Sequence, residues 1–275
     1  MRLADVGERG LLAELERRGL ARRIDNDAAQ LGGGLVVTQD ALVEGVHFLP
    51  ERISGRDLGF RAAAVNISDL AASGARPEAL VVTLGAPPET ALDDVLELYQ
   101  GIAEAGVPVV GGDTTRADKL FLSVTALGRS ERVPGRGGAR PGDRLVVTGT
   151  LGAAGAAFRE RSFARPPLRV EEGVLLARTA TAMLDVSDGL AVDAAHLGTR
   201  SGCRVEIDLA LVPLAEGASV ADLGFGEDYE LLAAVPGHTE APFAEIGRCV
   251  EGEGVVFTLD GEPYDLRGWD HYAAP

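Results

Sequence analysis

The sequence predicts a mixed α/β protein built from two halves. Short apolar runs with the length of strands alternate with longer segments in which leucine and alanine recur at helical spacing. The chain has 275 residues, of which 46% are hydrophobic, so it can bury a core as one large domain or as two of ordinary size. Residues 131–143 are rich in Gly, Pro and Arg and show no apolar period, which marks a boundary. We place this boundary near Gly138 and expect domains at 1–137 and 138–275.

The first half contains the clearest helix signals. Leu11, Leu12 and Leu15 recur at helical spacing and predict an entry helix. An alanine-rich segment predicts a long helix that ends at Gly74, because glycine is common just beyond helix C-termini. The expected helices are residues 8–18, 56–73 and 89–105. The expected strands are residues 35–37, 80–84, 107–110 and 120–127.

The second half repeats the mixture of elements without an internal sequence repeat. Asp260-Gly261 is a turn signal that follows the last apolar run. The expected helices are residues 169–181 and 188–201. The expected strands are residues 145–147, 204–209, 230–235 and 254–259.

Composition excludes several classes of partner. The formal charge of −16 argues against nucleic acid, because phosphate backbones are bound by clustered Lys and Arg. We find no apolar run long enough for a membrane span, and residues 1–8 lack the apolar core of a signal peptide. We therefore expect a cytoplasmic protein. The acidic surplus itself has two interpretations, bound divalent cations or a solvated surface.

Rare residue types exclude further chemistries. Lys119 is the only lysine, so a glycine-lysine-serine/threonine phosphate-binding loop cannot form. Cys203 and Cys249 are too few for a zinc cluster, and we interpret both as packing residues. No two of the four histidines have metal-ligand spacing, which argues against zinc. Any nucleotide chemistry must use another scaffold.

Aspartates among small residues recur along the chain and suggest a shared cation site. Asp113 follows the apolar run 107–110 and a Gly-Gly pair, which predicts a strand that ends in a glycine turn with a carboxylate at its tip. Similar segments carry Asp27, Asp40, Asp69 and the pair Asp185 and Asp188. Magnesium prefers such oxygen ligands and bridges carboxylates to substrate phosphates, and phosphoryl transfer depends on this neutralisation.

Two of these segments also have structural interpretations. Asp69 lies near the C-terminal end of its predicted helix, where the helix dipole repels an acid unless a cation lies beside it; solvent exposure is the alternative. Ser187 and Asp188 precede a predicted helix, so one of them can cap it and leave backbone amides facing a ligand. The segment 149–155 follows a strand and opens a helix, and we favour a plain strand-to-helix turn over a phosphate-binding loop.

Two further residues are candidates for substrate contacts. His47 lies shortly after Asp40 and can reach the same site as a hydrogen-bonding group, although a structural role is the alternative. Trp269, the only tryptophan, is either a core anchor or a platform for an aromatic ring.

Taken together, these segments resemble the thiamine-monophosphate kinases, in the superfamily of aminoimidazole ribonucleotide synthetase, selenophosphate synthetase and the hydrogenase maturation dehydratase. The resemblance runs from about Gly7 to Tyr272. Its distinctive stretches are residues 40–48, 64–77, 110–116, 185–190, 226–231 and 268–272. It implies a two-domain aminoimidazole ribonucleotide synthetase-like fold, a homodimer joined through the N-terminal sheets, and an active site between the domains.

The resemblance also implies the reaction and its residues. The γ-phosphoryl group of ATP would pass directly to the phosphate of thiamine monophosphate, giving thiamine diphosphate and ADP, with several Mg²⁺ ions screening the two anions. Gly112, Asp113, Arg136 and Ser187 match ATP-contacting positions, and Asp113, Asp40, Asp69 and Arg136 are the expected catalytic set. His47, Glu227 and Trp269 match positions that hold thiamine monophosphate. The implied metal ligands are Asp27, Thr38, Gln39, Asp40, Asp69, Asp113, Asp185 and Asp188.

Three residues depart from the family pattern. Asn26 replaces an aspartate before Asp27, Gln39 replaces a threonine before Asp40, and Phe225 replaces a glycine before Gly226. We therefore keep two alternatives: another ATP-using member of the superfamily, and a homologue that binds nucleotide or metal without turnover.

Overall fold

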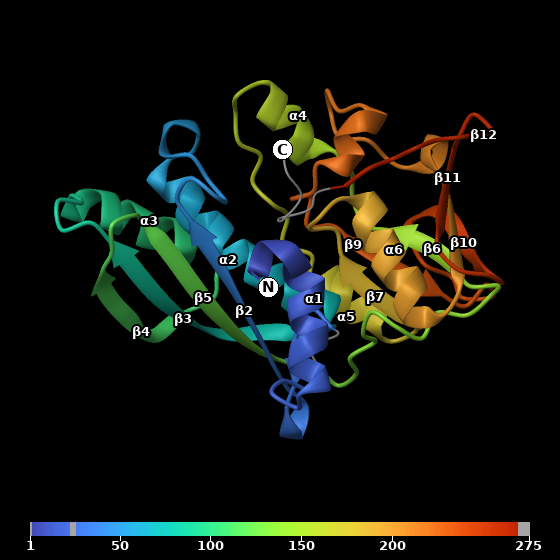
Figure 1. Cartoon of the computed structure of the whole chain (residues 1–275), viewed down its shortest axis with the longest axis horizontal. Helices are drawn as coiled ribbons and strands as arrows, with labels where there is room; N and C mark the ends of the chain where they lie inside the picture. The colour runs from blue at the N-terminus through green and yellow to red at the C-terminus, as the bar shows by residue number, and fades with distance from the viewer. Residues whose placement is uncertain (1, 23–25, 269–275) are drawn as a thin grey trace.

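The computed structural model describes residues 2–22 and 26–268. Two β-sheets lie on either side of a long central helix, α2, with the N-terminal half on the left of Figure 1 and the C-terminal half on the right. The α-helices of the described residues are α1 (Leu3–Arg17), α2 (Gly55–Ala72), α3 (Leu92–Glu104), α4 (Ala153–Arg159), α5 (Val170–Ala177) and α6 (Leu190–Ser201). The mixed α/β prediction is confirmed.

The N-terminal sheet has five strands in the order β1-β2-β5-β3-β4. Alternate residues of β2, β5 and β3, such as Val36, Val124 and Val82, are buried against α2 and α3, as the two-residue period of strands requires. The opposite face carries half-buried or exposed residues such as Gln39, Ser123 and Thr125. The strands are β1 (Ala29–Gln30), β2 (Leu35–Val43), β3 (Arg76–Ala86), β4 (Val109–Arg116) and β5 (Phe121–Arg129).

The C-terminal sheet has seven strands in the order β12-β11-β8-β10-β6-β9-β7. One face packs on α6, and the other packs on α5 and the C-terminal end of α2 through Ala71 and Ala72. The strands are β6 (Arg144–Val147), β7 (Ala182–Asp185), β8 (Arg204–Asp208), β9 (Leu231–Val235), β10 (Ala244–Val250), β11 (Val255–Leu259) and β12 (Glu262–Pro263). The expected division near Gly138 lies between β5 and β6 and remains a prediction.

Helix α2 is buried along nearly its whole length because both halves pack on it. Its Ser54 N-cap accepts a hydrogen bond from the amide of Asp57, at 3.0 Å, which satisfies one free donor of the first turn. Gly74 follows the last turn with φ +62°, as predicted. Gly173 of α5 touches the helix, and a Cβ there would lie 2.2 Å from the carbonyl oxygen of Ala71. Small residues therefore allow the close packing that places Asp69 between the halves.

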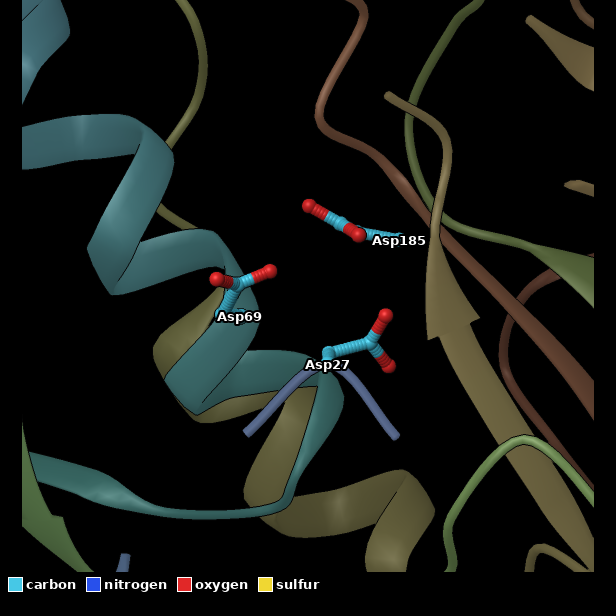
Figure 2. Close-up of side chains that lie close together, drawn as sticks. All are labelled: Asp27, Asp69 and Asp185. Carbon is cyan, nitrogen blue, oxygen red and sulfur yellow. The ribbon is translucent and has the colours of Figure 1, made fainter. Parts of the chain in front are cut away.

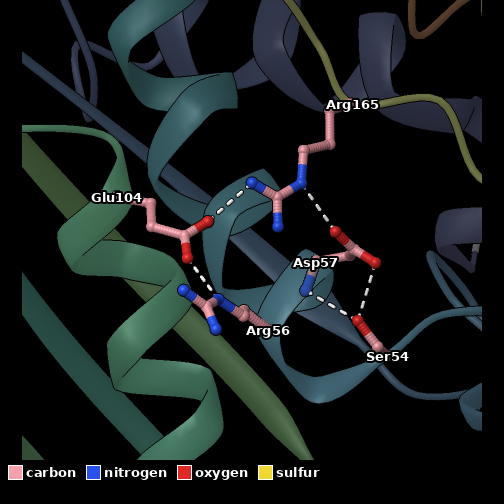
Figure 3. A network of polar contacts seen from close by, with 5 residues as sticks. All are labelled: Ser54, Arg56, Asp57, Glu104 and Arg165. Atoms are coloured by element: carbon pink, nitrogen blue, oxygen red, sulfur yellow. Dashed lines mark hydrogen bonds and ion pairs between the residues drawn. The ribbon is translucent and has the colours of Figure 1, made fainter.

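An arginine from the second half ties the loop after α4 to the first half. Arg165 donates to Asp57 and to Glu104, each at 2.6 Å, and Glu104 also pairs with Arg56 (Figure 3). The guanidinium also stacks on the Phe60 ring, with 4.7 Å between its Cζ and the ring centroid. This network joins α2, α3 and the α4–α5 loop, so it holds the two halves in one arrangement.

Several strand predictions need correction. Residues 111–116 form no turn: β4 runs from Val109 to Arg116 beside β3 as a parallel neighbour. Gly112, at φ +156°, fits against β3, where a Cβ would meet the Val82 carbonyl oxygen at 1.9 Å. Strand β2 likewise continues through Gln39 and Asp40 to Val43. Strands β7 and β10 were not predicted, whereas the turn at Asp260-Gly261 is confirmed.

Candidate functional site

Three of the predicted aspartates meet between the two halves. The carboxylates of Asp27, Asp69 and Asp185 each offer an oxygen, and these oxygens all lie within 4.8 Å of one another. Figure 2 shows them converging from the loop before β1, from the C-terminal part of α2 and from the end of β7. The fold thus brings together acids separated by more than 150 positions in the sequence.

Asp40 is the fourth member of this group, which we call the aspartate cluster (Asp27, Asp40, Asp69 and Asp185). It lies on the α2-facing side of β2, and its charge raises the pKa of Asp69. Its backbone amide donates to the Asn66 side chain at 3.0 Å. Thr38, two residues earlier on the same face, donates to Asp69 at 2.5 Å. Alternate residues of one strand therefore contact one helix.

Burial makes the cluster costly when all four carboxylates are ionised. Burial, followed by the charges of neighbouring aspartates, raises the pKa of Asp69 well above its usual range. Burial and the charge of Asp27 raise the pKa of Asp185 to about 7. Burial also raises the pKa of Asp27 and of Asp40. A bound divalent cation would remove this penalty, because it favours the charged forms.

Arg136 forms an ion pair with one member of the aspartate cluster. Its Nε donates to Asp27 at 2.8 Å, and the Asp27 side chain is only 2% exposed. Burial alone would lower the pKa of Arg136, but the charge of Asp27 and this hydrogen bond raise it. Within residues 2–22 and 26–268, Arg136 is the one cation that forms an ion pair with the cluster, so its four carboxylates keep an excess of negative charge there.

Neutral side chains fix the orientation of the cluster. Ser68 donates to the Asp185 carboxylate at 2.6 Å inside the buried part of α2. Asn26, a departure from the family pattern, accepts a hydrogen bond from the Arg136 amide at 3.0 Å. An amide oxygen serves that purpose without a charge, so this substitution leaves the aspartate cluster in place.

The loop after β7 holds the next predicted residues. Asp188, half-buried, donates its amide to the buried carboxylate of Asp193, at 3.0 Å. Ser187 accepts from the amide of Glu227 at 2.8 Å, which fixes the loop of Glu227 on the loop of Asp185 and Asp188. Asp193 was not predicted, although an acid in the first turn of a helix after a Ser-Asp-Gly segment is a signal that could have found it.

His47 and Glu227 come together through a residue that sequence reasoning missed. Arg61 of α2 is 5% exposed, donates to the His47 carbonyl at 2.8 Å and forms an ion pair with Glu227. An arginine within an alanine-rich helix is the sequence signal that could have found it, since a charge that such a helix buries is costly unless it is paired. Glu227 itself has φ +63°, a conformation that the tight turn after Gly226 imposes.

Other predicted residues lie elsewhere. Gln39 points to the open face of the N-terminal sheet, where its amide donates to Ser123 at 3.0 Å. Asp113 lies on the same open face. Its partner on β3 is Thr83, whose partner on β5 is Ser123. Ser123 in turn pairs with Ala41 of β2, which is on the same face as Gln39. Three strand spacings separate Asp113 from β2, about 14 Å. Within one chain, Asp113 and Gln39 side chains therefore lie away from the aspartate cluster. Trp269 lies outside the described residues.

Backbone amides of the glycine-rich turn 149–155 already donate to a carboxylate of the same chain. The Asp228 carboxylate accepts the amide of Gly152 at 2.9 Å and that of Ala154 at 3.5 Å. These amides are the groups that a phosphate would need. The plain structural turn is therefore the better interpretation.

The cluster has the chemistry of a magnesium site. Its donors are carboxylate oxygens, supported by hydroxyl and amide groups, and no sulfur or imidazole lies among them. Hard cations such as Mg²⁺ prefer this set and usually share one or two carboxylates with substrate phosphates. The residues that would hold the ion are Asp27, Asp69 and Asp185, with Asp40 beside them. Among the described helices none is long and apolar enough to cross a membrane.

Comparison with known proteins finds a matching family model and relatives that are similar over nearly the whole chain. Residues 25–130 match the family model "AIR synthase related protein, N-terminal domain". The thiamine-monophosphate kinase of Aquifex aeolicus (strain VF5) is 34% identical, with 99% of this chain and 100% of the relative covered. That of Escherichia coli (strain K12) is 35% identical, with 98% and 99% covered.

Solved structures show the same similarity. AaThiL complexed with AMPPCP and TMP superimposes with a TM-score of 0.90 at 34% identity, covering 98% of this chain and 99% of that one. The hydrogenase maturation protein HypE in complex with ATP shares the fold, with a TM-score of 0.68 at 20% identity and coverage of 97% and 98%. By its full-length similarity to these kinases, the chain belongs to the thiamine-monophosphate kinase family.

Proposed function

We propose that this protein transfers the γ-phosphoryl group of ATP to the phosphate of thiamine monophosphate, giving thiamine diphosphate and ADP. The observation that carries the proposal is the aspartate cluster, in which several buried carboxylates are opposed, among the described residues, by the guanidinium of Arg136. Such an excess of negative charge suits Mg²⁺, which would screen the two reacting anions. Family membership supplies the substrates.

Direct transfer needs no nucleophile from the protein. An oxygen of the acceptor phosphate forms a bond to the γ-phosphorus while the bond from that phosphorus to the β,γ-bridging oxygen breaks, and ADP leaves. The aspartate cluster and Asp188 would hold Mg²⁺. Arg136, close to Asp27, would contact the ATP phosphates and offset developing charge, together with the backbone near Ser187 and, from strand β4 of the partner subunit, the backbone near Gly112.

The acceptor would lie on the side of the site formed by both halves. His47 comes from the loop after β2 and Glu227 from the turn before β9, and Arg61 joins them. The Glu227 carboxylate, although paired with Arg61, would attract the positive ring of thiamine, and Trp269 would stack on a heterocycle. These three residues would fix the acceptor phosphate relative to the cluster.

We also infer a homodimer whose partner completes the site. Every residue of β4 is exposed in the single chain, including Val109 and Val110, and an uncovered edge strand of this kind favours pairing with another chain. Asp113 lies on this strand, about 14 Å from β2, so it cannot ligate an ion held by Asp40 of its own chain. The partner subunit's aspartate cluster is the site that it could reach.

A cytoplasmic location fits the two buried, unbridged cysteines.

An assay for thiamine diphosphate tests the proposal. Purified protein is incubated with Mg²⁺, ATP and thiamine monophosphate, and product is separated by chromatography. Product formation is expected, and Asp113→Asn should abolish it without lowering the melting temperature. Binding of both substrates with no product under varied metal and temperature would instead favour an inactive homologue, and ATP use with another acceptor would favour a different superfamily activity.

Mixed dimers test the shared site. Asp113→Asn and Asp69→Asn proteins are each inactive alone, and unfolding and refolding them together lets subunits exchange. If each site takes Asp113 from one chain and Asp69 from the other, an equal mixture regains about one quarter of the wild-type activity. No recovery, with mixed dimers shown by mass spectrometry, would place both residues in one chain's site.

A further inference from the structure

Two phenylalanines and an arginine form a contact between the two halves that the reaction outlined above does not use. The rings of Phe158, in α4, and Phe225, after the 3₁₀ helix η4 (Val220–Gly224), lie with centroids 5.0 Å apart at an interplanar angle of 35°. Arg52 of the 3₁₀ helix η2 (Pro50–Arg52) stacks on Phe158, with its Cζ 4.8 Å from the centroid. We call these three residues the aromatic wall.

The aromatic wall is close in sequence to the residues proposed to hold the acceptor. Phe225 lies two residues before Glu227, and Arg52 lies five residues after His47. Arg61 joins the two acceptor residues, since it contacts both His47 and Glu227. Two residues of the wall are therefore carried by the same chain segments as His47 and Glu227, one from each half of the protein.

The position of Phe225 is fixed by the turn that follows it. Gly226 has φ +85°, and a Cβ there would meet the Ser187 carbonyl oxygen at 2.4 Å. The amide of Glu227 donates to the same oxygen at 2.8 Å. The ring of Phe225 is thus carried on a backbone that is anchored to the loop of Asp185 and Asp188.

Packing alone does not account for the aromatic pair. Helix α4 is already held on η4 by Arg159, which donates to both oxygens of Asp222, at 2.8 and 2.9 Å. Phe158 remains 50% exposed despite its two neighbours. Within the described residues the buried Nη1 of Arg52 has no hydrogen-bond partner, and such a donor calls for an acceptor. An exposed ring beside an unsatisfied cation fits a ligand that carries a flat ring and, apart from it, an acidic group.

We propose that Phe225, together with Phe158, is a specificity-determining residue that contacts the heterocyclic part of the acceptor. This inference rests on the proposed kinase function, and it adds a contact that the family pattern does not supply, because that pattern has glycine at this position. A thiamine ring is flat and cationic, so an aromatic wall beside Glu227 offers it both dispersion and cation–π attraction. Arg52 lies where it can donate to an acidic group of the same ligand.

Steady-state kinetics with Phe225→Ala test the inference. The variant should raise the KM for thiamine monophosphate about 10-fold, the loss expected for one aromatic contact with its buried area. The KM for ATP and kcat should stay near the wild-type values, because the aspartate cluster is not touched. Phe225→Leu keeps apolar bulk but loses the ring. Its KM for thiamine monophosphate should therefore lie between those of the wild type and Phe225→Ala.

Matched variants separate this effect from a loss of structure. Phe158→Ala should also raise the KM for thiamine monophosphate, whereas Leu211→Ala removes an exposed apolar side chain from η3 (Leu209–Leu211) and should change neither constant. Melting temperatures of all variants are measured beside the kinetics. An unchanged or lower KM in both Phe225→Ala and Phe158→Ala would overturn the inference.

Product formation and substrate binding together distinguish a failure of this inference from a failure of the proposed function. If the wild-type protein forms no thiamine diphosphate, the proposed function fails, and calorimetric binding of thiamine monophosphate then decides the role of the wall. Binding that weakens about 10-fold in Phe225→Ala would support the wall. Equal binding by wild type and variant, or none by either, would reject it.

Discussion

Two groups of buried acids among the described residues differ in how their charge is balanced. In the aspartate cluster, four carboxylates face Arg136 and a few neutral donors. In the second group, Glu230 accepts two hydrogen bonds from Arg169, at 2.6 and 2.7 Å, and one from Thr148 at 2.6 Å. Asp228 beside it accepts backbone amides of the turn before α4. Buried acids that the chain itself satisfies serve the fold, whereas buried acids left in excess indicate a cation site.

The largest expected difference between the two groups is in catalysis. Asp69→Asn should lower kcat by at least about 100-fold, because it removes a proposed ligand for the cation that would neutralise the reacting phosphates. It should also raise the melting temperature of the metal-free protein, since like charges repel around Asp69. Kinetics and thermal unfolding of one preparation measure both effects. A variant that stays active but unfolds earlier would reverse the assignment of the two groups.

Stability should respond in the opposite sense at the second group. Glu230→Ala leaves the half-buried Arg169 without its main partner and should lower the free energy of unfolding by about 3 kcal/mol, as measured by urea denaturation. The matched control is Glu171→Ala, which breaks the ion pair with Arg76 on the surface and should leave the urea midpoint unchanged. Equal effects of the two substitutions would show that the buried pair adds nothing.

The pH dependence of stability gives a smaller but more specific effect. The folded-state pKa of Asp185 is raised to about 7, so between pH 4 and 7 the folded state binds more protons than the unfolded state. Stability of the metal-free protein should therefore fall as pH rises through this range. Saturating Mg²⁺ should offset the fall at pH 7 to 8, because it binds the ionised cluster.

Thermal unfolding from pH 4 to 8, with Mg²⁺ and with EDTA, checks this expectation. Burial also raises the pKa of Asp228, to about 6. The part of the stability loss that comes from Asp228 should persist in Mg²⁺, because Asp228 lies outside the aspartate cluster. A melting temperature that rises with pH in EDTA would contradict the description of the cluster.

The smallest effect is expected for the departure next to the cluster. Asn26 accepts the amide of Arg136, and an aspartate can accept the same bond. Asn26→Asp should therefore leave kcat within about 3-fold, because a charge at this exposed position is screened. A 100-fold change, read from the same product assay, would place Asn26 in the metal site.

Sequence reasoning named the four residues of the aspartate cluster but not their arrangement. Asp69 and Gly74 were placed correctly because helix period and helix ends are local properties. The strand β4 was predicted too short, since its pairing with β3 depends on residues far away in the chain. Gln39 and Asp40 were grouped together, although strand alternation sends them to opposite faces once β2 is known to continue through both. The ion pair of Arg61 with Glu227 joins residues 166 positions apart, and only the tertiary fold shows it.

Calorimetric titration of Mg²⁺ into the metal-free protein tests most directly whether the aspartate cluster is the metal centre. Wild type and Asp185→Asn are compared at pH 7.5, with Asp228→Asn as the control from the second acidic group. We expect Mg²⁺ binding to weaken at least about 10-fold in Asp185→Asn and to remain unchanged in Asp228→Asn. Equal binding by wild type and Asp185→Asn would contradict the assignment.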